Sequence, residues 1–347
     1  MVRKRLSYID YLKITAMFGV IMSHSLAETL NQNRFSFDWH VKNIFLGTVS
    51  PAVGIFFMVS GALILSSTKT DNIGYLFKHR LVKIMVPFLI WSGISILVMM
   101  QLDGNVSWGM WLHRMLLLYN RFPIIPFWFL YPLIGFYLLS PILKAFVDKA
   151  SMRTLDYAII LWFVTNICLP FIAQLLPKKF GIYFTYIPNS NLIILGQTIG
   201  YFLLGYRLDK TPIKPHTFQS NVVATLLLLA ITIILNYENL LYHWHIPVIG
   251  YAPSIFAVIL AMEIFLMVKK WDYYHPLTRS RRRRVTLLST MSYGVYLTHG
   301  MVIQIIEEAF HIDNFFLVFL LTSVICLVFT YAVSKIPKAR FFLLGMD

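Results

Sequence analysis

Apolar runs about as long as a bilayer is thick recur along almost the whole chain, and they restrict its fold more than any other feature. A helix that crosses the hydrocarbon core needs about 20 mostly apolar residues. Ten runs approach this length, near residues 10–30, 44–66, 80–100, 125–146, 155–175, 191–208, 220–236, 248–268, 287–308 and 314–335. The sequence therefore predicts an all-α, polytopic membrane protein with about ten transmembrane helices.

The composition supports this class. Hydrophobic residues make up 58% of the chain and charged residues 13%, whereas soluble domains contain about 45–50% and about 25%. Continuous apolar runs such as residues 222–235 exclude an outer-membrane barrel, whose strands alternate apolar and polar side chains. We expect one membrane domain over residues 1–347, without a fused soluble domain and without a cleavable signal peptide.

The distribution of Lys and Arg predicts the orientation in the membrane. With ten spans and a cytoplasmic N-terminus, 23 of the 30 basic residues lie on the cytoplasmic side, and Lys13 lies within the first span. The six outside are Arg34, Lys42, Arg114, Arg121, Lys178 and Lys179. The positive-inside rule then predicts that both termini are cytoplasmic. The formal net charge of +15 therefore indicates contact with anionic lipids at basic loops, and no nucleic-acid partner is expected.

The first predicted span keeps four ionisable side chains, those of Asp10, Lys13, His24 and Glu28. Each would cost several kcal/mol in lipid unless it were paired. At about 100° per residue the four lie within an arc of roughly 60°, with Lys13 and His24 about 16 Å apart along the axis. This stripe predicts a water-filled or substrate-filled interior. Asp10 is expected to pair with Lys13, because an unpaired lysine there would be costly.

Two further stretches have both a structural and a functional interpretation. Pro51 and the glycines up to Gly61 predict a kinked or broken helix, which either lines a cavity or allows close helix packing at Gly61. Arg80 and Lys83 are three residues apart and share a helix face. They are suited to bind phosphates together, or to anchor lipid headgroups at the membrane surface.

Three other features have mainly structural interpretations. Tyr296 and His299 belong to a stretch with a second intramembrane histidine among hydroxyls, and such a histidine is more often a hydrogen-bonded structural group than a catalyst. The aromatic residues 127–131 are typical of an interfacial belt, and Gly196 with Gly200 indicates helix packing. Histidine, cysteine and acidic residues do not occur at metal-ligand spacing, so no metal is expected.

Taken in order, these stretches resemble the acyltransferase-3 family of integral membrane acyltransferases. The hallmark of that family is a basic residue, ten further residues and then a histidine, which Lys13 and His24 match. Residues 56–61 are similar to its Phe-Phe-x-x-Ser-Gly element, and residues 292–299 are similar to its late histidine-containing stretch. Arg80-x-x-Lys83 is similar to its basic cytoplasmic pair. Lysine at position 13 lacks the bidentate fork of the commoner arginine.

The resemblance implies transfer of an acyl group, usually acetyl, from cytoplasmic acyl-coenzyme A to a hydroxyl of an extracytoplasmic glycan or lipid-linked sugar. It implies a multi-pass protein of the bacterial cytoplasmic membrane with acetyl-coenzyme A as donor. Lys13, Arg80 and Lys83 are then expected to bind the donor phosphates. His24 is expected to act as a general base or as an acyl-carrying nucleophile.

Glu28 and Ser60 are expected to belong to the catalytic set together with His24, and Asp10, Gly61, Tyr296 and His299 to the supporting set. Glu28 is expected to orient the His24 ring, Ser60 or the Gly61 amide to assist the developing oxyanion, and Asp10, Tyr296 and His299 to support the site. A transporter or flippase for a polar or lipid-linked substrate is the main alternative, because buried charges and a kinked helix also describe carriers. A non-catalytic receptor is a third hypothesis. The acceptor and the acyl length stay open, and an oligomer is compatible with the sequence.

Overall fold

The computed structural model describes residues 7–27, 36–175, 196, 198–214, 218–242 and 254–346, and these residues form helices and no strand. The predicted all-α class is therefore confirmed. The longer helices are α1 (Ser7–Ala27), α2 (Phe37–Val49), α3 (Ala52–Ile64), α5 (Val82–Leu102), α6 (Trp108–Leu116), α7 (Leu130–Lys149), α8 (Met152–Phe163), α9 (Leu169–Leu175), α11 (Ile199–Lys210), α12 (Phe218–Tyr242), α13 (Ile255–Tyr274), α14 (Arg279–Gln304), α15 (Phe315–Ser334) and α16 (Pro337–Leu344). Short turns include η1 (Thr68–Asp71), α4 (Ile73–Tyr75), η2 (Leu76–Leu81), η4 (Ile125–Phe129), η5 (Val164–Cys168) and η8 (Ile305–Ala309).

Six helical segments within the described ranges are long and apolar enough to cross a membrane. They are Phe37–Ile64, Ile73–Leu102, Ile125–Lys149, Met152–Ala173, Phe218–Tyr237 and Phe315–Ser334. The other four predicted runs coincide with α1, α13 and α14, which are more polar, and with α11, which has 12 residues. The chain is thus a polytopic helical membrane protein, and the count of ten spans stays a prediction.

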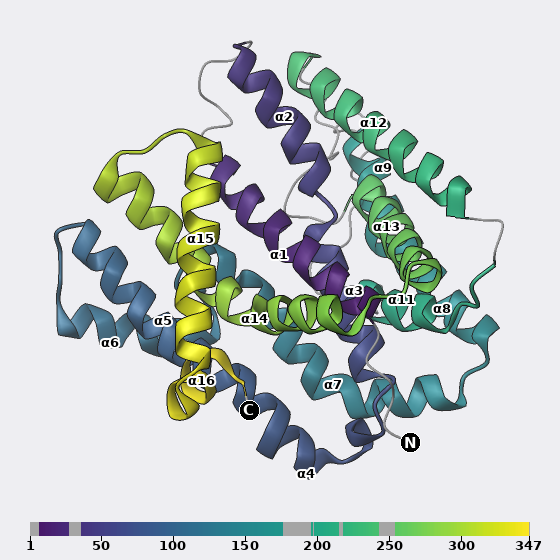
Figure 1. Cartoon of the computed structure of the whole chain (residues 1–347), viewed down its shortest axis with the longest axis horizontal. Helices are drawn as coiled ribbons and strands as arrows, with labels where there is room; N and C mark the ends of the chain where they lie inside the picture. Colours follow the sequence, from purple (N-terminus) through teal and green to yellow (C-terminus); the bar gives the residue numbers. More distant parts are fainter. Residues whose placement is uncertain are drawn as a thin grey trace.

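Helix α1 runs through the middle of the molecule (Figure 1). It packs against α2, α3, α13, α14 and α15, so neighbours from both halves of the chain surround it. Polar side chains on a helix at membrane depth have to face protein or a water-filled space. The central position of α1 satisfies this requirement for the polar stripe that the sequence predicts.

The predicted break at Pro51 is confirmed. Helix α2 ends at Val49 and α3 begins at Ala52, with Pro51 directly before its first turn. Proline is tolerated there because the first helical N–H groups have no partner within the helix. Helix α7, by contrast, continues through Pro141.

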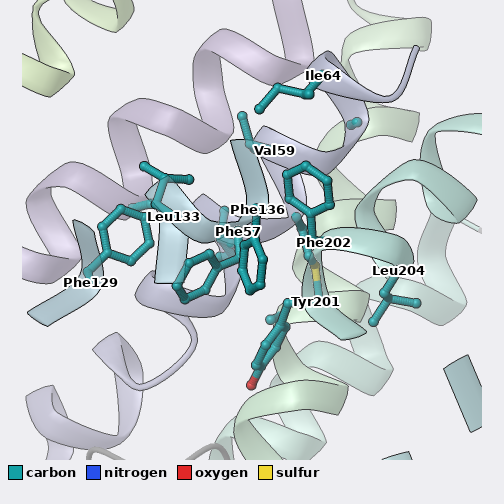
Figure 2. Packing of buried hydrophobic residues seen from close by; sticks show 14 of the residues in the cluster. Phe57, Val59, Ile64, Phe129, Leu133, Phe136, Tyr201, Phe202 and Leu204 are labelled. Carbon is teal, nitrogen blue, oxygen red and sulfur yellow. The ribbon is translucent and has the colours of Figure 1, made fainter. Parts of the chain in front are cut away.

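Helices α3 and α11 touch through their backbones. A Cβ atom added to Gly61 would lie 1.8 Å from the Phe202 carbonyl oxygen, and one added to Gly205 would lie 1.9 Å from that of Met58. Both positions therefore require glycine, which confirms the packing interpretation of Gly61. Figure 2 shows Phe202 beside Phe136, which in turn packs on Phe57, in the aromatic cluster that this contact brings together.

The aromatic stretch before α7 belongs to this core. Phe127 and Phe129 are buried, and Phe129 lies 4.4 Å from Phe57 between ring centroids. An interfacial belt would expose these rings, so the belt interpretation is wrong for these two residues. Their burial ties the start of α7 to the middle of α3.

Helix α11 has two further anchors. A Cβ atom on Gly200 would lie 1.7 Å from the Trp162 ring, which confirms the packing role of this glycine, whereas nothing in the described residues lies within 4 Å of one on Gly196. At the other end, the Lys269 ammonium donates to the carbonyl oxygens of Leu208, Asp209 and Thr211 at 2.9, 2.8 and 2.7 Å. A cation on the last carbonyls stabilises a helix C-terminus.

Candidate functional site

His24 of α1 faces His299 of α14. Their ring centroids are 5.4 Å apart, with the ring planes inclined by 47°. The two histidines come from opposite ends of the sequence, and they meet because α1 and α14 pack side by side. His24 is half-buried and lines a cavity, whereas His299 is completely buried.

The His299 ring is held from one side only. Its Nδ1 lies 2.6 Å from the Tyr296 carbonyl oxygen, one turn earlier in α14. A carbonyl can only accept, so Nδ1 carries the proton and donates. Nε2 is then a bare acceptor, and it has no hydrogen-bond partner among the described residues.

The cavity beside His24 has a volume of about 330 Å³. Four segments form its wall: the end of α1, the end of α5, the loop before η4, and α14 near its C-terminus. The lining residues are His24, Met99, Phe122, Pro123, Ile124, Ile125, Pro126, Gly300, Ile303 and Gln304. The wall is mostly apolar, so the imidazole of His24 is one of few polar groups facing this space.

Two features of α14 fix the loop wall in place. The Tyr296 hydroxyl donates to the carbonyl oxygen of Pro126. One turn further, a Cβ atom on Gly300 would lie 2.7 Å from Pro126 and 3.1 Å from Ile124, so the glycine lets the loop approach the helix. Residues 296–300 thus hold both His299 and the loop wall of the cavity.

The predicted phosphate-binding residues lie at the opposite ends of the helices. Lys13 precedes His24 by eleven residues, or about 16 Å, in α1, and Lys83 precedes Met99 by sixteen, or about 24 Å, in α5. Both lysines are half-buried. The basic set and the cavity are therefore separated along the helix axes.

Arg80 is held by the turn that follows α3. Its guanidinium donates to Thr70 Oγ1 at 2.7 Å and to Ser67 Oγ at 2.8 Å, and it lies 5.8 Å from the centre of the Tyr75 ring. These bonds use two of the five N–H donors of arginine, so donors are left for an anion. The π-helical turn η2 presents this side chain, and such turns are frequent at functional sites.

Asp10 is buried and accepts a hydrogen bond from Thr286 Oγ1 of α14 at 3.2 Å. A carboxylate at this depth needs such donors, since burial without them would be costly. The predicted pairing of Asp10 with Lys13 stays a prediction. The bond to Thr286 joins α1 to α14 at the end of this helix pair that lies away from the histidines.

Three tyrosines connect the region of Arg80 with α14. Tyr137 and Tyr293 are half-buried and Tyr296 is buried, and the side chain of Tyr137 lies near those of Arg80 and Tyr293. The Tyr293 hydroxyl donates to the Ile84 carbonyl oxygen at 2.9 Å. Tyr296 follows one turn later in α14, with its ring centroid 5.4 Å from that of His299.

Ser60 and Gly61 do not lie beside His24. Helices α1 and α3 run antiparallel, and a Cβ atom on Gly19 would lie 2.8 Å from that of Ala52. Ser60 lies eight residues from this crossing and His24 five residues in the other direction, which separates them by roughly 20 Å of helix rise. Ser60 is level with Lys13, and Gly61 packs on α11. Neither position suits an oxyanion formed next to His24. Glu28 lies outside the described residues.

A family model described as an acyltransferase domain, that of the acyltransferase-3 family, matches residues 6–335. The match covers nearly the whole chain, including both histidines and the basic residues. The chain belongs to the acyltransferase-3 family. No curated protein and no solved structure matches it.

In this member of the acyltransferase-3 family, the motif residues come from two levels of the molecule. His24 and His299 meet where α1 packs against α14, whereas Arg80 lies in η2, at the end away from the cavity. Groups of three His, Cys, Asp or Glu side chains able to hold a metal do not occur among the described residues. The expectation of no metal stays a prediction.

The loop wall of this acyltransferase was missed by sequence reasoning. Residues 122–126 carry no ionisable side chain, and the run of Pro123 and Pro126 around two isoleucines was the one available signal. Two prolines in five residues indicate a fixed, non-helical segment. That such a segment faces His24 depends on contacts across 170 residues of chain, which no local pattern encodes.

Proposed function

We propose that the chain transfers an acyl group, most simply acetyl, from cytoplasmic acyl-coenzyme A to a hydroxyl of an extracytoplasmic glycan or lipid-linked sugar. It would act in the bacterial cytoplasmic membrane with ten spans and both termini in the cytoplasm. One observation carries the proposal: in a member of the acyltransferase-3 family, His24 lines a cavity at the helix ends opposite to Lys13, Arg80 and Lys83.

The basic residues suit the donor. Coenzyme A carries phosphates at one end and the thioester at the end of a long flexible arm. In this proposal Lys13, Arg80 and Lys83 bind the phosphates, with Arg80 oriented for this by Thr70 and Ser67. The arm then extends between the helices toward His24. The basic set and the cavity are separated along the helix axes. Acyl delivery across the membrane requires movement of the acyl group in this direction.

His24 would remove the proton of the acceptor hydroxyl. As that proton moves to the imidazole, the acceptor oxygen forms a bond to the thioester carbonyl carbon. The carbon–sulfur bond then breaks, and the coenzyme A thiolate leaves and takes up the proton. In the alternative route the bare imidazole nitrogen attacks the thioester carbonyl carbon, and the carbon–sulfur bond breaks with departure of the coenzyme A thiolate. The acceptor oxygen then takes the acyl group from the acyl-imidazole, which frees the imidazole nitrogen, and the hydroxyl proton passes to the thiolate. Glu28 is retained as a group that orients the ring.

The test compares surface glycans and lipid-linked sugars from cells with and without the gene, by mass spectrometry. Loss of O-acyl groups in the deletion, restored by the wild-type gene and not by His24→Ala, supports the proposal. His113→Ala is the matched control, because His113 is exposed in α6. Normal product from His24→Ala at equal protein level would overturn the role of His24.

A second experiment distinguishes an acyltransferase from a carrier. Purified protein in vesicles is given radiolabelled acetyl-coenzyme A on one side and extracted lipid-linked sugars on the other. Acylated product supports the proposal. Movement of the sugar lipid across the bilayer without any acylated product would favour a transporter or flippase instead.

A further inference from the structure

We infer that His299 positions His24: its Nε2 accepts the N–H of the His24 ring and leaves the other His24 nitrogen bare toward the cavity. The inference rests on the proposed function for its chemical meaning. The pairing itself rests on the geometry of α1 and α14.

One nitrogen of His299 is a hydrogen-bond acceptor without a donor in the described part of the chain. Nδ1 is committed to the Tyr296 carbonyl oxygen at 2.6 Å, so Nε2 has to be an acceptor. The residue is completely buried, and Nε2 has no hydrogen-bond partner among the described residues. A buried acceptor without a donor destabilises the folded state. The fold therefore gains if a donor reaches it.

The donor that we assign to this nitrogen is the His24 ring. The His24 ring is 5.4 Å from the His299 ring between centroids. Because a ring nitrogen lies about 1.1 Å from its centroid, two nitrogens on the line between the rings would be about 3 Å apart, which is hydrogen-bond distance. The structure shows no hydrogen bond between the two rings, and the proposed bond requires a rotation of the His24 ring that would bring its N–H onto this line. Hydrogen bonds within a catalytic site often tighten in this way only when substrate is bound.

His299 does not contact a substrate in the cavity directly. The cavity is lined by His24 and by Gly300, the next residue, whereas His299 does not line it. An acceptor substrate in the cavity thus meets His24 first. A neutral imidazole has one N–H and one bare nitrogen. Donation of that N–H to His299 fixes the tautomer, and the bare nitrogen is the one that takes a proton or attacks a carbonyl.

Two variants of similar polarity separate the two nitrogens of His299. His299→Gln places an amide oxygen near the Nε2 position and keeps the acceptor. His299→Asn places its amide near the Nδ1 position, keeps the donor to Tyr296 and loses the acceptor. We expect His299→Asn to lower kcat by about 10–100-fold with KM for acyl-coenzyme A nearly unchanged. We expect His299→Gln to stay within about 3-fold of wild type.

A substrate-independent measurement accompanies the kinetics. Nitrogen-15 spectra of histidine-labelled protein in nanodiscs, assigned with His24→Gln, report the tautomer of His24. One tautomer in wild type and His299→Gln, and a mixture in His299→Asn, supports the inference. It is overturned by a mixture in wild type, by full activity of His299→Asn, or by equal losses in both variants. If wild type transfers no acyl group, the proposed function fails, and the spectra still decide the pairing.

Discussion

The Tyr296 hydroxyl donates to the carbonyl oxygen of Pro126 across 170 residues of chain. This bond joins the helix that carries His299 to the loop that closes the cavity opposite His24. A buried carbonyl that loses its donor is left unsatisfied, and the wall it belongs to is no longer fixed.

Tyr296→Phe removes this donor and little else. We expect it to lower stability by about 1–2 kcal/mol, measured as a lower midpoint of thermal unfolding in detergent. Acyl transfer should fall as well, because the loop wall is less well held. Tyr119→Phe is the matched control, since Tyr119 is 79% exposed. An unchanged midpoint for Tyr296→Phe would contradict this account.

Gly61→Ala and Gly205→Ala should prevent folding. In each case the added methyl group would lie within 2 Å of a carbonyl oxygen of the facing helix, and backbone cannot move aside as a side chain can. Size-exclusion chromatography of the detergent extract should show aggregate in place of a single peak. Gly135→Ala is the control, because nothing described lies within 4 Å of a Cβ atom there. A normal peak for both variants would argue against the backbone contact.

Arg80→Ala should weaken binding of acyl-coenzyme A by about 10–100-fold, since hydrogen bonds to charged groups contribute about 1.5–3 kcal/mol. Isothermal titration on purified protein measures this. The effect should shrink for a donor that lacks the nucleotide phosphates. Lys78→Ala removes the same charge from the same turn at an exposed position, and it should change affinity little. Equal losses in both variants would indicate a general charge effect.

We expect the stability of the protein to depend on pH through the carboxyl group of Asp272. It lies near the end of α13, where burial, followed by the nearby Asp10, raises the pKa of its carboxyl above the usual value. The folded state then binds the proton more tightly than the unfolded state, so this contribution is present at low pH and is lost as pH rises through the folded-state pKa. Asp272→Asn keeps an oxygen for the Tyr8 N–H, now 3.0 Å from Asp272 Oδ2.

We expect Asp272→Asn to be at least as stable as wild type at pH 7 and to show a flatter profile of melting temperature against pH above about 4, the ordinary range of the carboxyl group. Asp103→Asn serves as control because Asp103 is exposed. A steeper profile in Asp272→Asn would mean that the sign of the pKa shift is wrong.

Local chemistry explains which features could be predicted from the sequence. Pro51 lacks an N–H and favours a helix boundary, and a glycine within an apolar run indicates close packing, as at Gly61. The histidine and lysine of the first helix share a face because the helical repeat is fixed. Each of these follows from a few residues without knowledge of the fold.

The rest depends on contacts between distant segments. Ser60 lies next to Gly61 in a motif, yet the antiparallel crossing of α1 and α3 sets it level with Lys13 and away from His24. The pairing of His24 with His299 depends on how α14 packs on α1. Hydropathy also has limits here, since α1 and α14 are too polar to qualify as spans by composition although they lie at the centre of the molecule.

The contact of α3 with α11 has a consequence for movement during turnover. With Gly61 and Gly205 each against a carbonyl of the other helix, a slide or rotation by one residue would force a side chain into backbone. Lys269 and Trp162 hold α11 at its two ends. We therefore expect these two helices to keep their relative position when other parts of the molecule rearrange.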